Sequence, residues 1–405
     1  MNEHAADARA AVPAAGSSSV FLALLPIMAA VLVAFLVIGL ALPVLPLHLR
    51  SDLRFGPFVV GLVTGSQFAA SLLSRVWAGR TCDREGPKRA VTIGLLCATV
   101  AGLLYLGSLP FVGQPVVSVA VLLTGRAILG GAESFIITGA TVWGLARVGA
   151  PHAGKVIAWM GTAMFLAFAA SAPLGIAIYG RSGFAGVAGA TALAPLLVLL
   201  PVAALRAAVP SRQGAASVLS VVRNIWLPGV GAALSSIGFG VILSFASLLF
   251  AERGWTPVWL PFTAYAVALI VARLLFGHLP DKVGGARVAT WCVFIEAAGL
   301  ALLGLGSTAT LAAVGAALTG FGYALVFPGL GVEAIRRVPS ASRGLAMGAY
   351  TACLDLALGI AGPALGLVAT GAGLGAAFLV SALVVLAAAV VSVALIQAPR
   401  VEMPG

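Results

Sequence analysis

The chain has 405 residues, of which 61% are hydrophobic and only 9% are charged, and its formal net charge is +11. A mean hydropathy of +1.11, with apolar runs longer than a soluble core needs, excludes a water-soluble globular protein and indicates a polytopic membrane protein. The net positive charge does not indicate a nucleic-acid partner, because the sequence has no hydrophilic domain on which basic residues could form a binding surface.

Twelve apolar segments follow one another along the chain, each long enough for a spanning helix, which needs about 20 residues. They are predicted to be helices because lipid cannot hydrogen-bond exposed backbone and no alternating barrel strands are present. The predicted spans cover residues 20–48, 57–78, 91–110, 116–142, 156–179, 184–205, 225–250, 257–279, 287–307, 309–335, 344–370 and 373–397. Acidic residues before the first span favour an uncleaved start over a signal peptide.

The distribution of basic residues predicts the orientation. With the N-terminus inside, 16 of the 23 Lys and Arg residues lie in tails and loops on that side, four lie outside and three fall within spans. Because basic residues accumulate on the cytoplasmic side, both termini are expected in the cytoplasm. The tails 1–19 and 398–405 and the linker 206–224 are then cytoplasmic.

An internal repeat relates the two halves of the chain. The stretch SRVWAGRTCDREGPKR (Ser74–Arg89) matches ARLLFGHLPDKVGGAR (Ala272–Arg287) at six positions, each pair separated by 198 residues. The pairs are Arg75 and Arg273, Gly79 and Gly277, Asp83 and Asp281, Arg84 and Lys282, Gly86 and Gly284, and Arg89 and Arg287. The repeat predicts an all-α membrane protein of two pseudo-symmetric six-helix bundles, 20–205 and 225–397, with a ligand site between them.

The pattern Gly79-x-x-x-Asp83-Arg84-x-Gly86-x-Lys88-Arg89 resembles the signature loop of the major facilitator superfamily, and Gly277, Asp281, Lys282 and Gly284 form its degenerate second copy. LTGRAILGGAES (Leu123–Ser134) is similar to the fourth-helix motif of that superfamily. The chain most resembles its bacterial sugar-efflux-like or drug-efflux-like proton antiporters. This resemblance implies the major facilitator fold and a place in the bacterial inner membrane.

Two proline segments bear on the antiporter resemblance. ASAPLGIA departs from the family's fifth-helix motif, since Ala172 precedes Pro173 and only Gly175 follows. GIAGPALG, with Gly362 and Pro363, keeps the pattern better. We expect helix packing and bending at Pro173, Gly175, Gly362 and Pro363.

The charged repeat is expected to act as a gate. The resemblance implies that Asp83 faces the start of the eleventh helix near Arg343, and Asp281 the start of the fifth near Lys155, when the cytoplasmic side is shut; helix N-termini favour such carboxylates. The alternative is a basic loop that sets topology alone. The expected gating residues are Gly79, Asp83, Arg84, Gly86, Arg89, Gly277, Asp281, Lys282 and Gly284.

Charges inside the spans are the candidates for the transport pathway, because each costs about 3 kcal/mol at mid-bilayer and normally faces a partner or water. Arg126 lies near the midplane, with Glu133 on the same helical face and Asp355 similarly deep in the eleventh span. We expect Arg126 to bind a polar or anionic substrate group or to control a nearby acid; the alternative is a fixed ion pair. Glu133 and Asp355 compete as proton carrier, and Gln67 is a further pathway candidate.

Other intramembrane charges have structural interpretations. Glu296 is expected to make an internal hydrogen bond in a peripheral helix. Arg75 and Arg273 are interpreted as gate or snorkelling residues rather than ligands.

No nucleotide-binding loop, nucleophile elbow or metalloprotease motif occurs, so neither an enzyme nor a pump is expected, and no metal or cofactor. The predicted function is secondary transport of a small organic solute by alternating access, as proton-coupled efflux by antiport. Proton-coupled uptake of a sugar or organic acid, or a non-transporting sensor on the same fold, stays open. The expected partners are the solute, protons and the lipid bilayer, with the monomer as the functional unit.

Overall fold

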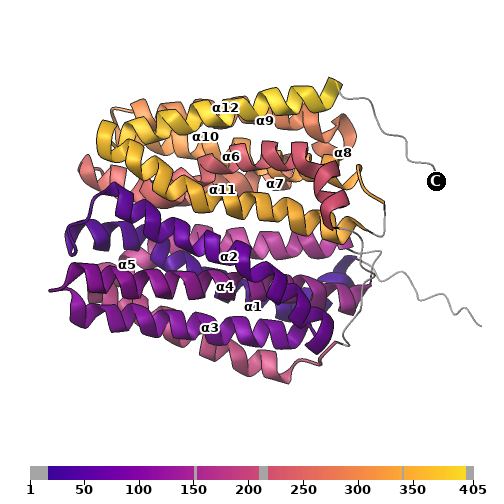
Figure 1. The fold of residues 1–405 in the computed structure, drawn as a ribbon, viewed down its shortest axis with the longest axis horizontal. Coiled ribbons are helices and arrows are strands. Elements are labelled where there is room, and N and C mark those ends of the chain that lie inside the picture. The colour runs from indigo at the N-terminus through magenta and orange to yellow at the C-terminus, as the bar shows by residue number, and fades with distance from the viewer. Residues whose placement is uncertain (1–16, 150–152, 209–217, 340–341, 398–405) are drawn as a thin grey trace, which may run out of the picture.

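The computed structural model describes residues 17–149, 153–208, 218–339 and 342–397, and the regular structure in these ranges is helical (Figure 1). The first six-helix set contains α1 (Ser17–Ser51), α2 (Pro57–Glu85), α3 (Pro87–Ser108), the short η1 (Leu109–Phe111), α4 (Pro115–Val148) and α5 (Ala153–Ala204). The second contains α6 (Val218–Glu252), α7 (Leu260–Phe276), α8 (Leu279–Val283), α9 (Gly285–Leu305), α10 (Ala309–Ile335), α11 (Arg343–Ala372) and α12 (Leu374–Gln397).

These helices make twelve membrane crossings. Within the described residues, ten helices are long and apolar enough to span a bilayer, and α7 is a shorter apolar helix of 17 residues. The 52-residue α5 contains two crossings, joined by a kink at Gly183, where φ is 61°. This left-handed conformation favours glycine, because a Cβ would clash with the backbone. The predicted all-α fold of twelve spans in two six-helix bundles is confirmed.

Two helix boundaries differ from the predicted spans by seven residues, more than the others do. Helix α2 continues to Glu85, beyond the predicted end at residue 78, so Asp83 lies in its last helical turns. Helix α6 begins at Val218, inside the predicted linker. Charged residues end a hydrophobic span without ending the helix. The helix stops at Gly86, where φ is 93°, and Pro87 begins α3.

The two bundles meet mainly along two pairs of helices. Helix α2 packs on α11 and the first part of α5 packs on α7, while α1 also contacts α6. Figure 1 shows α2 and α11 side by side at the boundary between the indigo-to-magenta and the orange-to-yellow bundle. Because α2 corresponds to α7 in the sequence repeat, the two contacts are related by the pseudo-symmetry of the halves.

A close backbone approach between the bundles lies near the start of α2. A Cβ placed on Gly61 would overlap the carbonyl group of Gly362, and a Cβ on Gly362 would overlap the carbonyl group of Gly61. Small residues at such contacts allow transmembrane helices to approach closely. The α2–α11 contact is therefore specified by glycine on both sides.

One end of the molecule is closed by its central helices. We call the end at which α1 begins and α12 ends the terminal end, and the other the distal end (Figure 1). Towards the distal end, residues 37–46 of α1 and 238–250 of α6 are all buried. Towards the terminal end, α6 exposes Leu219, Val222 and Trp226. The first helix of each bundle therefore helps to seal the distal end.

Candidate functional site

The candidate site is built on one face of α2. Gln67, Ser71 and Arg75 follow one another at intervals of four residues, so their side chains lie on the same side of the helix. Gln67 and Ser71 are buried, and the Arg75 side chain is 20% exposed. This polar face of α2 lies between α4 and α11, both of which pack against it.

An ion pair connects this face to the other bundle. Arg75 donates from Nε to Oδ2 of Asp355 on α11 at 2.5 Å, and Ser71 donates from Oγ to the same oxygen at 3.4 Å. Asp355 is only 2% exposed, so its charge depends on these partners for compensation. The sequence interpretation of Arg75 as a snorkelling or gate residue did not include this ion pair.

A second acid reaches α2 from α4. Gln67 donates from Nε2 to Oε2 of Glu133 at 2.6 Å. Glu133 also interacts electrostatically with Asp355, Arg75 and Arg126. The structure therefore brings together all four residues predicted for the pathway, Gln67, Arg126, Glu133 and Asp355, in one electrostatic network that includes Arg75.

Arg126 differs from the other members of this network. It is fully buried in α4, and among the described residues none of its three guanidinium nitrogens has a hydrogen-bond partner or an ion pair. The buried Tyr105 hydroxyl on α3 interacts with it electrostatically and approaches it as a hydrogen-bonding neighbour, although the contact does not reach full hydrogen-bond geometry. A buried guanidinium with unused donors is suited to a carboxylate, a phosphate or another polar acceptor that reaches it. A fixed ion pair, the alternative interpretation of Arg126, is not observed among the described residues.

The charges of this network are balanced. Two arginines, Arg75 and Arg126, face two acids, Glu133 and Asp355. Protonation of either acid leaves a net positive charge in a buried site, which favours release of the ion pair or entry of an anionic group. The arrangement can therefore link proton binding to the contact between the bundles.

The repeat places a different interaction at the symmetry-related contact. The guanidinium of Arg273 on α7 lies 4.5 Å from the ring centroid of Phe165 on α5, and its Nε donates to the Ala324 carbonyl at 3.1 Å. Phe165 follows Ala153 by the same number of residues as Asp355 follows Arg343 at the start of α11. The α2–α11 contact thus holds an ion pair where the α5–α7 contact holds a cation–π interaction.

The predicted gating residues lie at the terminal end. Gly79 is inside α2, and Asp83 and Arg84 are exposed on its last turns. Arg89 pairs with Glu85 at 2.6 Å on the surface. In the second copy, Gly277 follows α7, while Asp281 and Lys282 are exposed on α8. Gly86 and Gly284 share a positive φ, 93° and 108°, immediately before α3 and α9.

The contacts expected of the two gate acids are not present in this state. Among the described side chains, neither Asp83 nor Asp281 has a hydrogen bond or an ion pair, and Arg343 at the start of α11 is exposed. The side chain of Lys155 lies outside the described part of the chain. The structure instead shows a role for Lys88, whose Nζ donates to the carbonyls of Ala203 and Leu205 at the end of α5.

The predicted packing residues lie at helix contacts. Pro173 is inside α5, where Gly175 approaches the backbone of Leu40 on α1. Gly362 contacts α2 as described above, and the Pro363 ring lies 3.0 Å from the position of a Cβ on Gly65. Gly175, Gly362 and Pro363 therefore lie where two helices approach closely.

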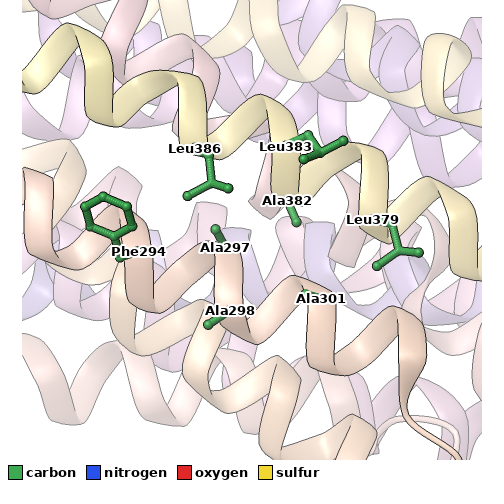
Figure 2. Close-up of a pocket in the computed structure, with 8 residues that line it drawn as sticks. All are labelled: Phe294, Ala297, Ala298, Ala301, Leu379, Ala382, Leu383 and Leu386. Atoms are coloured by element: carbon green, nitrogen blue, oxygen red, sulfur yellow. The ribbon is translucent and has the colours of Figure 1, made fainter.

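An apolar groove lies outside this network. The groove, of about 420 Å³, lies between α9 and α12, with Phe294, Ala297, Leu383 and Leu386 among its lining residues (Figure 2). It contains no charged side chain, so it lacks the chemistry of a solute site.

Among the described residues, no three His, Cys, Asp or Glu side chains are grouped as metal ligands.

Ser71 was not selected from the sequence, and Arg75 was interpreted as a gate or snorkelling residue and not as part of the site. A signal was available, because polar residues at four-residue spacing in an otherwise apolar helix mark an interior face. The position of Asp355 opposite that face could not be read from spacing, since the two residues lie in different bundles.

Comparisons with known proteins agree with this architecture. The model of the Major Facilitator Superfamily matches residues 27–262 and 228–405. An MFS-type transporter of Salmonella typhimurium is 40% identical over 387 residues, covering 95% of this chain and all of the relative. The MFS-type transporter YhhS of Escherichia coli is 38% identical and covers 91% of each chain. The structure of a D-xylose–proton symporter superposes with a TM-score of 0.76 at 15% identity, covering 94% of this chain and 98% of that one.

Proposed function

We propose, since the chain belongs to the major facilitator superfamily, that it moves a small organic solute across the bacterial inner membrane in exchange for protons, as an efflux antiporter. The transporter fold follows from the family, and the exchange with protons is our inference from the site. The monomer is the functional unit in this proposal, with one solute pathway between its two bundles.

The observation that supports proton exchange is the ion pair between Arg75 and Asp355. It joins the two bundles at a buried position, and Glu133 lies within electrostatic reach of both residues. Protonation of Asp355 would remove the charge that holds Arg75. Proton binding would therefore weaken the contact between α2 and α11, which has to change if the two bundles rock.

Arg126 supports the solute-binding part of the proposal. Its buried guanidinium offers donors to a polar or anionic group, and Glu133 links it to the proton-binding network. Solute and proton would then bias the same conformational equilibrium, which is the requirement for coupling. One proton that moves down the membrane potential supplies about 2.3 kcal/mol per 100 mV.

The closed distal end suggests the direction in which the pathway opens. The positive-inside rule favours a cytoplasmic position for the terminal end, and residues 37–46 of α1 and 238–250 of α6 are buried towards the opposite end. Asp83 is exposed and makes no contact expected of a shut cytoplasmic gate. We therefore assign the described structure to an inward-facing state.

The proposal is tested by transport in liposomes. Purified protein is first screened by thermal shift against sugars, organic acids and amphiphilic cations, and ligands that raise Tm are then measured for flux under an imposed pH gradient. The wild type should move such a ligand against the direction of proton flow. Arg126→Ala and Asp355→Asn should abolish this flux while the protein stays folded, whereas Arg181→Gln, an exposed residue near the kink of α5, should retain it.

Two outcomes would contradict parts of the proposal. Flux in the same direction as protons would exclude antiport and favour symport, the mode of the D-xylose–proton symporter of similar fold. Flux that is insensitive to the pH gradient, or equal in wild type and both variants, would exclude proton coupling at this site.

A further inference from the structure

A second buried acid lies outside the site described above. Glu296 on α9 is fully buried, and Ser235 on α6 donates from Oγ to its Oε2 at 2.5 Å. The other carboxyl oxygen, Oε1, has no hydrogen-bond partner among the described residues. Gly238 on α6 leaves the space for it, since a Cβ there would lie 2.5 Å from Oε1.

The surroundings of Glu296 provide no compensating cation. The titratable groups that face it are Tyr265 on α7, Tyr323 on α10 and Cys292 on its own helix. Helix α12, which also packs on α9, has no titratable side chain, and no ion pair reaches Glu296 within the described residues. An ionised carboxylate with one neutral partner is costly in such a place, whereas a neutral carboxyl group is tolerated.

The polar contacts of Glu296 are too few to balance a negative charge. Its single hydrogen bond, from Ser235 to Oε2, is open to a protonated carboxyl group as well as to a carboxylate. The protonated form is favoured because Oε1 has neither a donor nor a cation beside it among the described residues. The sequence expectation of an internal hydrogen bond at Glu296 is thus compatible with an additional role in binding a proton.

Tyr323 connects this acid with the contact between the bundles. Its hydroxyl lies 3.1 Å from the Ser236 hydroxyl, and its ring stacks on Phe239, which in turn contacts Phe168 of the other bundle. Tyr323 interacts electrostatically with both Glu296 and Asp355. Tyr323 therefore lies between Glu296 and the ion pair at α2 and α11, within electrostatic reach of both acids.

We propose that Glu296 is a second proton-binding site, located within the C-terminal bundle, that holds a proton in this state and exchanges it with solvent. Binding forms one O–H bond at the carboxyl group of Glu296 and breaks one O–H bond of a hydronium ion from solvent, which becomes water. The contribution of this site to transport rests on the proposed proton-coupled function, whereas its occupation by an exchangeable proton does not.

Infrared spectroscopy of the full-length protein in lipid nanodiscs tests the proposal without a transported solute. At neutral pH the wild type should show the carbonyl stretch of a protonated carboxylic acid, and E296Q should lose it. Transfer to D₂O should shift this band. E252Q, which changes an exposed acid at the end of α6, should leave the band unchanged.

A spectrum that is identical in wild type and E296Q would overturn the proposal, as would a Glu296 band that does not shift in D₂O. Ser235→Ala gives an independent readout if E296Q does not fold. Loss of the hydrogen bond to Oε2 should move the carbonyl band to higher frequency, and an unmoved band would again contradict the assignment. Liposomes that show no proton-coupled flux would contradict the proposed function but leave these spectra unaffected.

Discussion

Arg75 and Asp355 are 280 residues apart in the sequence, and their side chains meet at 2.5 Å across the two bundles. This contact joins a guanidinium that is 20% exposed to a carboxylate that is 2% exposed. Removal of either partner leaves the other charge in a site from which water is largely excluded. The pair should therefore make a measurable contribution to the stability of the described state.

A double-mutant cycle measures this contribution. Arg75→Gln and Asp355→Asn should each lower the free energy of unfolding by about 2 kcal/mol, less than the 3–5 kcal/mol typical of fully buried pairs because Arg75 is partly exposed. The double variant should lose less than the sum of the two. Tm of the purified protein in detergent is the measurement, and strictly additive losses would show that the pair is not coupled. The exposed pair Arg89 and Glu85 is the control, with an expected coupling below about 1 kcal/mol.

Replacement by alanine should lower stability at the two glycines that precede α3 and α9, but not at a glycine inside α2. Gly86→Ala and Gly284→Ala force a side chain into a conformation with positive φ, and each should lower stability by about 1–2 kcal/mol. Gly79→Ala should be neutral or slightly stabilising, because a Cβ at this helical position meets no atom within 4 Å. Thermal unfolding of the three variants checks this order, and an equal loss at Gly79 would contradict it.

The glycine contact between α2 and α11 should not tolerate a methyl group. In Gly61→Ala the new Cβ overlaps the carbonyl of Gly362, and overpacking of this kind typically costs about 1–3 kcal/mol. Gly107→Ala, at a position with no atom within 4 Å, is the matched control. Gly61→Ala should lower Tm, whereas Gly107→Ala should not. Equal Tm values would mean that α2 and α11 can separate at this point without cost.

Asp83→Asn tests the proposed gate. If Asp83 stabilises a state closed on the cytoplasmic side, its neutralisation should increase the inward-facing population. The reporter is S244C on the buried distal part of α6, in a protein whose native cysteines are replaced. Labelling by a membrane-impermeant thiol reagent should slow in the Asp83→Asn background. Unchanged labelling would leave the charged repeat with its topological role alone.

The fold was predictable because its main signals are local. Apolar length defines each crossing, and the repeated glycine and acid positions relate the two bundles. Gln67, Glu133 and Asp355 could be selected because polar groups are costly in hydrocarbon. The same reasoning locates a residue in depth along its helix, which is why Glu296 was also noticed.

What the sequence did not predict depends on the packing of distant helices. The partner of Asp355 could not be identified, since the rotation of α11 against α2 is set by glycine contacts such as Gly61 with Gly362. The end of α2 was placed too early because hydropathy reports the bilayer boundary and not the end of the helix. Capping of α5 by Lys88 likewise requires two elements whose proximity only the folded chain shows.

The burial of α6 has a consequence for biogenesis. Its sequence is apolar enough to enter the bilayer alone, yet residues 238–250 have no exposed face once the bundles have assembled. This stretch must therefore give up its annular lipids when the neighbouring helices close around it. Lateral escape from the translocon and final enclosure are thus separate events for α6, and Ser235 meets its partner Glu296 on α9 only in the second.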